Sequence, residues 1–321
     1  MTARCPLSEP EKIKALVDIM TDFSQETPTP DLRSEHPKGV ADVTARFRVL
    51  DHLPEECRVG LFAEAGEYDA VIRFSNSAAM RDDQRDTHGM AVQVKGVPMA
   101  TSPCNAAGET IQDFILIDSP TFVIGDLGTY VPFAEAFMQA KLNLMGKLKM
   151  GLLVLQNLTL LPGLMRLGLK RPNAPLGTPY WSTTPYRLGD LRVKYKAVPI
   201  GSPPSPTAIR GREGRRKALA RQLAIGPGLF SFCVIISDNR TSQPIDDPSV
   251  DWEETGARVV PLAEIHIPDQ AVDAPPELED ALGFSPGHAS REHAPLGEMN
   301  RARVAIYAAA RAARQKAAAR R

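Results

Sequence analysis

A tyrosine and three arginines near the C-terminus have a spacing that could support chemistry. Arg303, Tyr307, Arg311 and Arg314 follow one another at intervals of four, four and three residues. On a helix, all four side chains would therefore share one face. Three cations around one phenol favour its ionised form, and an ionised tyrosine is an anionic oxygen ligand for ferric haem. The same pattern also fits an amphipathic C-terminal helix whose arginines only meet solvent.

Two of the arginines would have distinct tasks if the tyrosine binds haem. Arg303 lies one helical turn before Tyr307 and could donate a hydrogen bond to the phenolate oxygen. Arg314 could pair with a haem propionate through both edges of its guanidinium group. The spacing therefore allows a haem-binding helix over about 299–318.

The overall composition is that of an ordinary globular protein. Hydrophobic residues make up 43% and charged residues 24% of the 321 positions, which argues against extended disorder. Acidic and basic residues balance to a formal net charge of zero, so nucleic acid is not the expected partner. The four cysteines form no CxxC pair, which argues against a zinc site or a disulfide framework and indicates a reducing compartment. Because no signal peptide precedes them, we expect a cytoplasmic protein.

The elements that must position these residues are mostly strands. A capping box at Ser8 to Glu11 predicts a first helix through about Phe23, followed by a proline-containing linker at 26–30. About eight strands with irregular spacing fit an α+β fold, a closed antiparallel barrel decorated by helices. We expect residues 1–30 to form the helix and linker, and residues 31–321 one domain with barrel strands over about 44–267. The predicted strands are Thr44–Leu50, Tyr68–Ser75, Met90–Val97, Phe114–Ile124, Leu191–Val198, Leu229–Ser237 and Arg258–Ile267.

A helical, apolar insertion is predicted over about 133–171. Between positions 141 and 171 the chain has six basic residues and no acidic one. Polar residues interrupt the apolar run, so it is not typical of a membrane span. One interpretation packs these helices on the barrel with the basic residues outward. The other makes the segment an interfacial surface that contacts anionic lipid or admits an amphipathic substrate.

Two glycine-containing stretches have no predicted function. The proline- and arginine-rich stretch 201–222 predicts a loop and a basic helix start, which is typical of a solvated face. The glycines at 226 and 228 lack the strand-to-helix context of a phosphate-binding loop. We therefore expect no nucleotide cofactor.

Several short motifs occur in a fixed order along the chain. They are the stretches 33–39 (RSEHPKG), 71–76 (VIRFSN), 85–92 (RDTHGMAV) and 284–307, with Asp113, Phe114 and Phe122 between them. In this order and at this spacing the chain resembles the catalase family, most closely its short bacterial members. The resemblance covers roughly residues 30–137 and 280–314, with a weaker likeness at 180–183.

The resemblance implies a b-type haem held between the barrel and the C-terminal helix. His36 would be the distal histidine, and Ser75 would hydrogen-bond its far ring nitrogen and fix the tautomer. Tyr307 would be the iron ligand, and Arg303 would keep it ionised. The expected site comprises the catalytic residues His36, Ser75 and Asp118, the metal ligand Tyr307, and the cofactor-binding residues Arg33, Arg73, Phe122, Phe284, Arg303, Arg311 and Arg314, of which Arg33, Arg73 and Arg314 resemble the arginines that pair with the propionates.

A haem at this site implies peroxide chemistry. His36 would take a proton from the peroxide oxygen that binds iron and return it to the departing oxygen, which leaves a ferryl haem. A second peroxide, or an organic reductant of unknown identity, would complete the cycle. The resemblance thus implies a haem-dependent peroxidase that reduces hydrogen peroxide or small organic hydroperoxides.

Two carboxylates depart from the family's pattern. The family places an asparagine where this chain has Asp118, and full-length catalases have a small apolar residue where it has Glu35. An asparagine can donate a hydrogen bond to peroxide, whereas an ionised aspartate only accepts one. Asp118 could donate if burial kept it protonated, and if charged it would stabilise the imidazolium form of His36. We therefore predict that catalase activity, the disproportionation of hydrogen peroxide, is weak.

The chain ends soon after Tyr307, where full-length catalases continue with a wrapping segment and a helical domain. The resemblance therefore implies a homodimer or another small homo-oligomer that lacks a nicotinamide nucleotide site. We expect no partner beyond the peroxide and its reductant, apart from a peripheral lipid contact through 141–171 under the second interpretation of that segment.

Three other functions remain open. A fatty-acid hydroperoxide isomerase or dehydratase of the allene oxide synthase kind shares the catalase barrel, and the acid-free segment 141–171 could receive a lipid tail. A haem carrier or sensor without turnover is compatible with Asp118 and Glu35. A scaffold without haem would leave Tyr307 without a ligand role.

Overall fold

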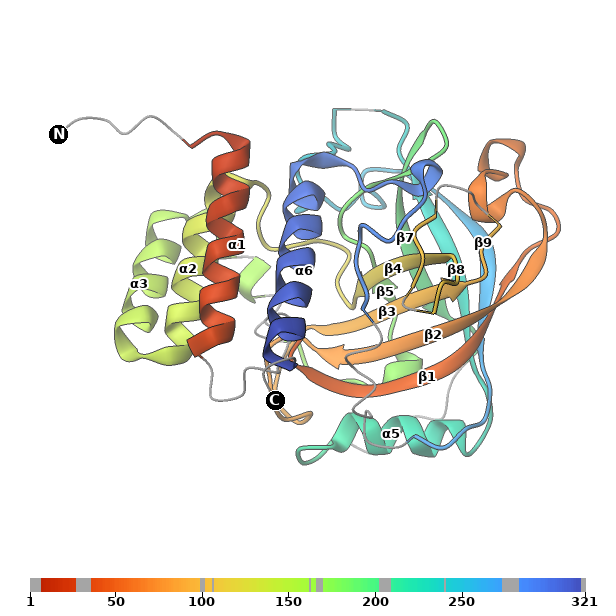
Figure 1. Cartoon of the computed structure of the whole chain (residues 1–321), viewed down its shortest axis with the longest axis horizontal. Coiled ribbons are helices and arrows are strands. Elements are labelled where there is room, and N and C mark those ends of the chain that lie inside the picture. The colour runs from red at the N-terminus through yellow and green to blue at the C-terminus, as the bar shows by residue number, and fades with distance from the viewer. Residues whose placement is uncertain are drawn as a thin grey trace.

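A single antiparallel sheet dominates the structure (Figure 1). The computed structural model describes residues 7–26, 36–98, 102–105, 107–161, 163–165, 170–201, 209–239, 241–272 and 283–318. The strands of this part of the chain are β1 (Lys38–Val49), β2 (Gly66–Asn76), β3 (His88–Lys95), β4 (Ile111–Ile117), β5 (Tyr180–Trp181), β6 (Tyr186–Leu188), β7 (Leu191–Pro199), β8 (Gly228–Ile236) and β9 (Arg258–Ile267). The helices are α1 (Glu9–Glu26), α2 (Leu127–Leu142), α3 (Leu144–Gln156), α5 (Gly214–Leu223) and α6 (Gly297–Ala318).

The sheet closes on itself as the sequence predicted. Its strand order is β5-β4-β3-β2-β1-β9-β8-β7-β6, and an additional pairing of β5 with β7 completes the cylinder. β6 extends β7 as a hairpin outside this ring. Full closure leaves few unpaired strand edges. The fold is therefore the expected closed antiparallel barrel with helices outside it.

Aromatic side chains fill the inside of the barrel. Phe47, Phe62, Phe114, Tyr195 and Phe232 are buried in the main hydrophobic cluster. The ring centroid of Phe114 lies 4.7 Å from that of Tyr195 and 4.7 Å from that of Phe232, within the range of favourable aromatic packing. Small barrels are commonly filled by side chains in this way. A large ligand must therefore bind outside the barrel.

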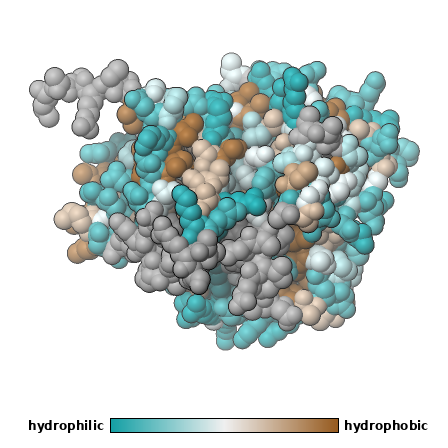
Figure 2. Space-filling view, viewed as in Figure 1, coloured by the Kyte–Doolittle hydropathy of each residue, from teal (hydrophilic) through white to brown (hydrophobic). Residues whose placement is uncertain are grey.

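A second hydrophobic cluster joins the outer helices. Met299, Ala302 and Ile306 of α6 pack with Leu16 of α1 and Leu127 of α2. Their spacing of three and four residues is that of one helix face. α6 thus lies between the barrel and the helices α1, α2 and α3, of which α3 is outermost, while α5 lies against another side of the barrel (Figure 1). Apolar residues appear at the left margin of Figure 2, where Figure 1 places α3.

The structure differs from the predicted elements at a few places. The predicted strand at 114–124 ends at Ile117, because the next residues turn away from the sheet. The predicted helical insertion begins at Leu127 rather than at 133, and it continues through Pro132. The first helix extends to Glu26, and the carboxylate of Glu11 accepts from the backbone N–H and the hydroxyl of Ser8, which is one half of the predicted capping box. Most of the predicted linker at 26–30 lies outside the described residues.

The two shortest strands were not predicted. β5 and β6 have two and three residues, too few for a period-two pattern to stand out. Within the part of the chain that the structure covers, no helix is long and apolar enough to cross a membrane.

Candidate functional site

A histidine, a serine and a glycine meet where β1, β2 and β3 lie side by side. His36 immediately precedes β1, and its Nδ1 lies 2.9 Å from Oγ of Ser75 in β2. Ser75 is buried and pairs in register with Gly89 of β3. A Cβ at Gly89 would lie 2.6 Å from Oγ of Ser75 and 2.8 Å from Nδ1 of His36. Only glycine therefore leaves room for the two side chains to meet here.

The backbone at His36 is held in an uncommon conformation. Its φ is 52°, in the left-handed region that residues other than glycine rarely adopt. The guanidinium group of Arg73, which is buried in β2, donates to the carbonyl oxygen of His36 at 3.2 Å. Such conformations persist when surrounding contacts fix them, and they cluster at functional sites.

The imidazole of His36 is neutral at ordinary pH. Burial lowers the pKa of His36 to about 3, and the charge of Arg73 acts in the same direction, while Asp118 opposes both. Arg303 also lowers this pKa. Arg303 belongs to α6, so one of the charges that lower this pKa comes from the C-terminal helix.

Asp118 is buried in an ion-pair network directly after β4. Its Oδ2 accepts from Nδ1 of His88 at 2.7 Å, and its Oδ1 lies 2.8 Å from Nζ of Lys170. The backbone N–H of His88 also donates to Oδ1 at 2.8 Å. Burial raises the pKa of Asp118, but His88 and Lys170 outweigh it and hold this pKa below its usual value. Asp118 is therefore ionised.

Of the two protonation states that the sequence allowed for Asp118, the structure supports the ionised one. The carboxyl group is not kept protonated by burial, so it cannot donate a hydrogen bond. Its two oxygens are directed at His88 and Lys170, and its effect on His36 is smaller than those of burial and Arg73. The expected stabilisation of an imidazolium at His36 is therefore outweighed.

A cavity of about 320 Å³ lies beside Asp118. Lys170 and Trp181 contribute to its wall, and the indole Nε1 of Trp181 donates to Glu253 at 3.0 Å. The cavity lies outside the barrel, where β4 ends and β5 begins. It could give a small molecule access to Asp118.

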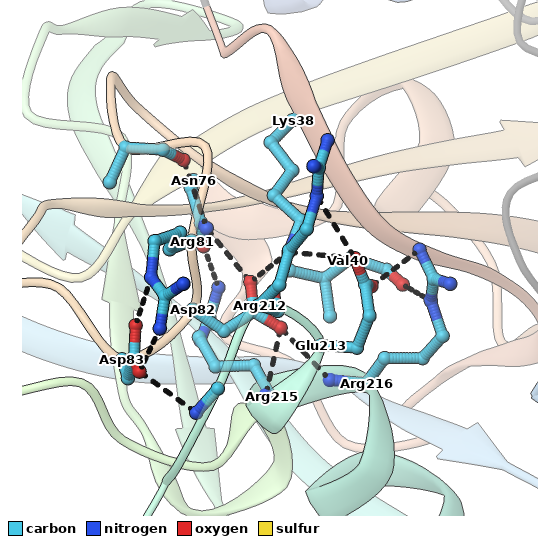
Figure 3. A network of polar contacts seen from close by, with 12 residues as sticks. Lys38, Val40, Asn76, Arg81, Asp82, Asp83, Arg212, Glu213, Arg215 and Arg216 are labelled. Atoms are coloured by element: carbon cyan, nitrogen blue, oxygen red, sulfur yellow. Dashed lines mark hydrogen bonds and ion pairs between the residues drawn. The ribbon is translucent and has the colours of Figure 1, made fainter.

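A buried arginine anchors the strands that carry the site (Figure 3). Arg215 of α5 is fully buried, and its Nη1 donates to the carbonyl oxygen of Ser75 at 3.1 Å and to Oδ1 of Asn76 at 2.8 Å. Its backbone N–H donates to Asp82 at 2.9 Å, and Asp82 also pairs with Lys38 at 2.7 Å. The network fixes the ends of β1 and β2 against α5. Sequence reasoning missed it, since Arg215 is one of several basic residues in a stretch expected to face solvent.

The predicted face of α6 is directed towards the barrel. Nη1 of Arg303 donates to Oγ1 of Thr184 at 2.6 Å and to Oδ1 of Asn300 at 2.9 Å. Asn300 in turn donates to the carbonyl oxygen of Pro185 at 2.7 Å. Tyr307, one turn further along, is partly buried. These bonds fix the angular position of α6, and Tyr307 lies on the same face of the helix as Arg303.

The segment before α6 is fixed between β4 and the helix. Asp113 of β4 accepts from the backbone N–H of Ser285 at 2.9 Å and pairs with Nδ1 of His288 at 2.8 Å. A Cβ at Gly283 would lie 2.9 Å from the guanidinium carbon of Arg311, so Arg311 packs directly on this segment. Phe284, which follows Gly283, is thereby buried next to α6.

The other residues that were expected at the site lie at different places along the structure. Phe122 contacts Tyr130 of α2 edge-on, with ring centroids 5.6 Å apart, and packs against the cluster of outer helices. Arg314 is partly buried on the same helix as Tyr307. Arg33 and Glu35 lie outside the described residues. The structure thus brings His36, Ser75 and Arg73 together, and Arg303, Tyr307, Arg311 and Arg314 all belong to α6.

The fold is that of the catalases. A bacterial catalase matches with a TM-score of 0.66 and 16% identity, covering 93% of this chain and 60% of its own. A fungal catalase matches with a TM-score of 0.68 and 15% identity (98% and 65%), and catalase A from Saccharomyces cerevisiae with a TM-score of 0.64 and 15% identity (98% and 66%). The chain thus spans somewhat less than two thirds of these catalases. No family model and no curated sequence matches it.

The residues present fit a haem group. The packed barrel interior leaves no room for a macrocycle, so the group would bind outside it, towards α6. Tyr307 supplies an oxygen donor, and Arg73 and Arg303 supply cations for an anionic ligand and for the propionates. Within the described ranges, no cluster of His, Cys, Asp or Glu could hold a metal ion.

Proposed function

We propose that this protein is a haem-dependent peroxidase with weak catalase activity. The observation that carries this proposal is the neutral His36, held by Ser75 beside Gly89 in a barrel of the catalase fold. Tyr307 belongs to the C-terminal helix α6, and we place it opposite His36 as part of the proposal. The substrates would be hydrogen peroxide and small organic hydroperoxides. An organic reductant would restore the resting protein.

The chain's own residues would bind the haem and move protons. Tyr307 would ligate the iron, and Arg33, Arg73 and Arg314 would hold the propionates; bound haem supplies the redox chemistry. With Nδ1 of His36 held by Ser75, proton transfer falls to Nε2. Its low pKa keeps that nitrogen free to accept a proton from the substrate hydroperoxide and to return it to the departing oxygen as water or alcohol leaves.

The ion-paired Asp118 supports peroxidase over catalase activity. An ionised carboxylate cannot donate the hydrogen bond that an asparagine would offer to peroxide. Lys170 and His88 hold Asp118 in the ionised form, so this property is built into the structure. A second hydrogen peroxide molecule is then a poorer reductant than an organic donor that needs no such hydrogen bond.

A fatty-acid hydroperoxide isomerase or dehydratase is the second candidate. The observation in its favour is the exposed apolar surface of α3 and the turn after it, which could receive a lipid tail. Product analysis separates the two candidates. A peroxidase consumes reductant and forms the alcohol, whereas the isomerase or dehydratase forms an epoxide or ketol without reductant.

The test is an absorption spectrum and an activity assay of protein produced with haem supplied. We expect a Soret band with the weak long-wavelength features of high-spin ferric haem bound to tyrosinate. Tyr307→Phe should change these features, and His36→Gln should abolish peroxide reduction while keeping the band. A band that Tyr307→Phe leaves unchanged would refute the proposed ligand. Haem binding without any reaction with stoichiometric peroxide would indicate a carrier or sensor instead.

A further inference from the structure

The outermost helix exposes large apolar side chains to solvent. Of the exposed large hydrophobic residues in the described parts of the chain, more than half lie between positions 144 and 165. They have exposed fractions of 42–72% and comprise Leu144, Met145, Leu148, Leu152, Leu155, Leu158, Leu161 and Met165. A contiguous apolar surface on a folded protein usually marks an interaction site.

Packing on α2 fixes which side of α3 is exposed. Gly146 is buried, and a Cβ there would overlap the backbone of Gln139 and Ala140 in α2. Leu153, on the same side of α3 as Gly146, is partly buried. The two helices are therefore in close backbone contact along this line. α3 cannot rotate to bury its other face without losing that contact.

The exposed face of α3 forms a regular stripe. Met145, Leu148, Leu152 and Leu155 follow at intervals of three, four and three residues, which places them on one side of the helix. The stripe continues into the turn after α3, where Leu158 is 63% exposed. This is the apolar half of an amphipathic helix, and it points away from the protein.

Lysines border the stripe on both sides. Lys147 and Lys149 are exposed and flank Leu148 along the chain. Nζ of Lys149 reaches Gln139 at 2.9 Å and Glu135 at 3.9 Å on α2. No acidic residue occurs from 141 to 171, against six basic ones. Lys147 and Lys149 thus place one cation on each side of the apolar stripe, and Lys149 is also paired with Glu135 of α2.

We infer that this stripe binds the surface of a bilayer that contains anionic phospholipid. The leucines would enter the boundary between headgroups and acyl chains, while the lysines remain at the level of the phosphates. Negative lipid charge complements the basic border. A second copy of the chain fits less well, because a symmetric contact would place the lysines of two stripes near each other without acidic partners on α3. This inference does not depend on the proposed peroxidase activity.

Flotation of the full-length protein with vesicles tests the inference. One set of vesicles contains phosphatidylglycerol and phosphatidylcholine in equal parts, and the other contains phosphatidylcholine alone. We expect binding to the anionic vesicles that decreases as salt rises. Each replacement among Leu148→Ser, Leu152→Ser and Leu155→Ser should lower the partition coefficient by roughly tenfold. Lys147→Glu should weaken binding to the anionic vesicles only.

Matched controls are available elsewhere on the surface. Ile225 is 68% exposed and Leu155 is 71% exposed, so Ile225→Ser removes a comparable apolar side chain far from α3 in sequence. Lys217→Glu provides the charge control on α5. Both controls should bind as the parent protein does. Equal binding to neutral vesicles, or equal losses in the controls, would overturn the inference. So would a dimer in solution that Leu152→Ser dissociates while no vesicle binds.

Discussion

Replacement of Gly89 by alanine tests the geometry of the candidate site directly. The φ of Gly89 lies outside the left-handed region, so alanine meets no backbone penalty and the effect is one of space alone. The added Cβ would lie 2.6 Å from Oγ of Ser75 and 2.8 Å from Nδ1 of His36. Ordinary contact begins at 3.4 Å. The two side chains must therefore retreat by about 0.8 Å and about 0.6 Å.

A displacement of this size should lower kcat/KM strongly and the free energy of unfolding only slightly. A displacement of about 1 Å in a reacting group can lower a rate on the order of 100-fold. Crowding in a packed site costs about 1–3 kcal/mol of unfolding free energy, which most domains tolerate. We expect Gly89→Ala to bind haem as the parent protein does, while its kcat/KM for peroxide reduction falls on the order of 100-fold.

The assay is steady-state peroxide reduction with an organic donor, alongside the haem-to-protein ratio and the melting temperature. Gly151→Ala is the matched control, because a Cβ at Gly151 meets no atom within 4 Å. It should leave kcat/KM and the haem-to-protein ratio unchanged, and it should raise the melting temperature slightly, because alanine stabilises a helix more than glycine does. If holo Gly89→Ala retained kcat/KM within about twofold of the parent, the contact of His36 with Ser75 would not support the reaction, and our account of the site would be wrong.

Further predictions concern charge and pH. The double replacement Asp118→Asn and Lys170→Met supplies an amide that can donate to peroxide and leaves no buried charge without a partner. Oxygen evolution from hydrogen peroxide, measured with an oxygen electrode, should therefore rise about tenfold. No rise would contradict the role given to Asp118. Because burial lowers the pKa of His36 to about 3, kcat/KM should show no loss of a catalytic base between about pH 8 and pH 5. Burial also lowers the pKa of His293 to about 4, so the unfolded chain binds the extra proton and stability falls with pH below about 6.5. Of the stability lost between about pH 7 and pH 5 in urea unfolding, His293 should account for about 2 kcal/mol. His36, whose pKa is also lowered, adds to the loss, so His293→Gln, which keeps an acceptor for the backbone N–H of Leu61, should reduce the loss by about 2 kcal/mol and not abolish it.

The sequence predicts the long elements of the fold and little of what joins them. β7, β8 and β9 lie within one residue of their predicted ranges, whereas β1 begins at Lys38, before the predicted start at Thr44. The predicted range of the last helix, 299–318, matches α6 to within its first turn. Patterns of this kind depend on many residues, so they survive local irregularity. β5 has two residues and is defined by its neighbours rather than by its own sequence.

The charged contacts of the site could not be predicted from the sequence. Lys170 is 52 positions from Asp118, and no local pattern relates the two. His36 and Ser75 are 39 positions apart, and their contact was expected from the resemblance to catalases rather than from spacing. Arg215 was expected on a solvated surface, because the burial of an arginine depends on partners that only the fold assembles.

At β5 the barrel is closed by only a few paired residues of the described strands. β5 pairs with β4 only through Ile117 and Trp181, and with β7 through Tyr180 and Trp181. Local opening concentrates where few hydrogen bonds hold neighbouring segments together. This seam borders the cavity beside Asp118, so transient parting of β4 and β5 would widen that cavity. Amide protons of β5 should thus exchange with deuterated solvent sooner than those of β1 or β8, and a molecule bound in the cavity should slow them.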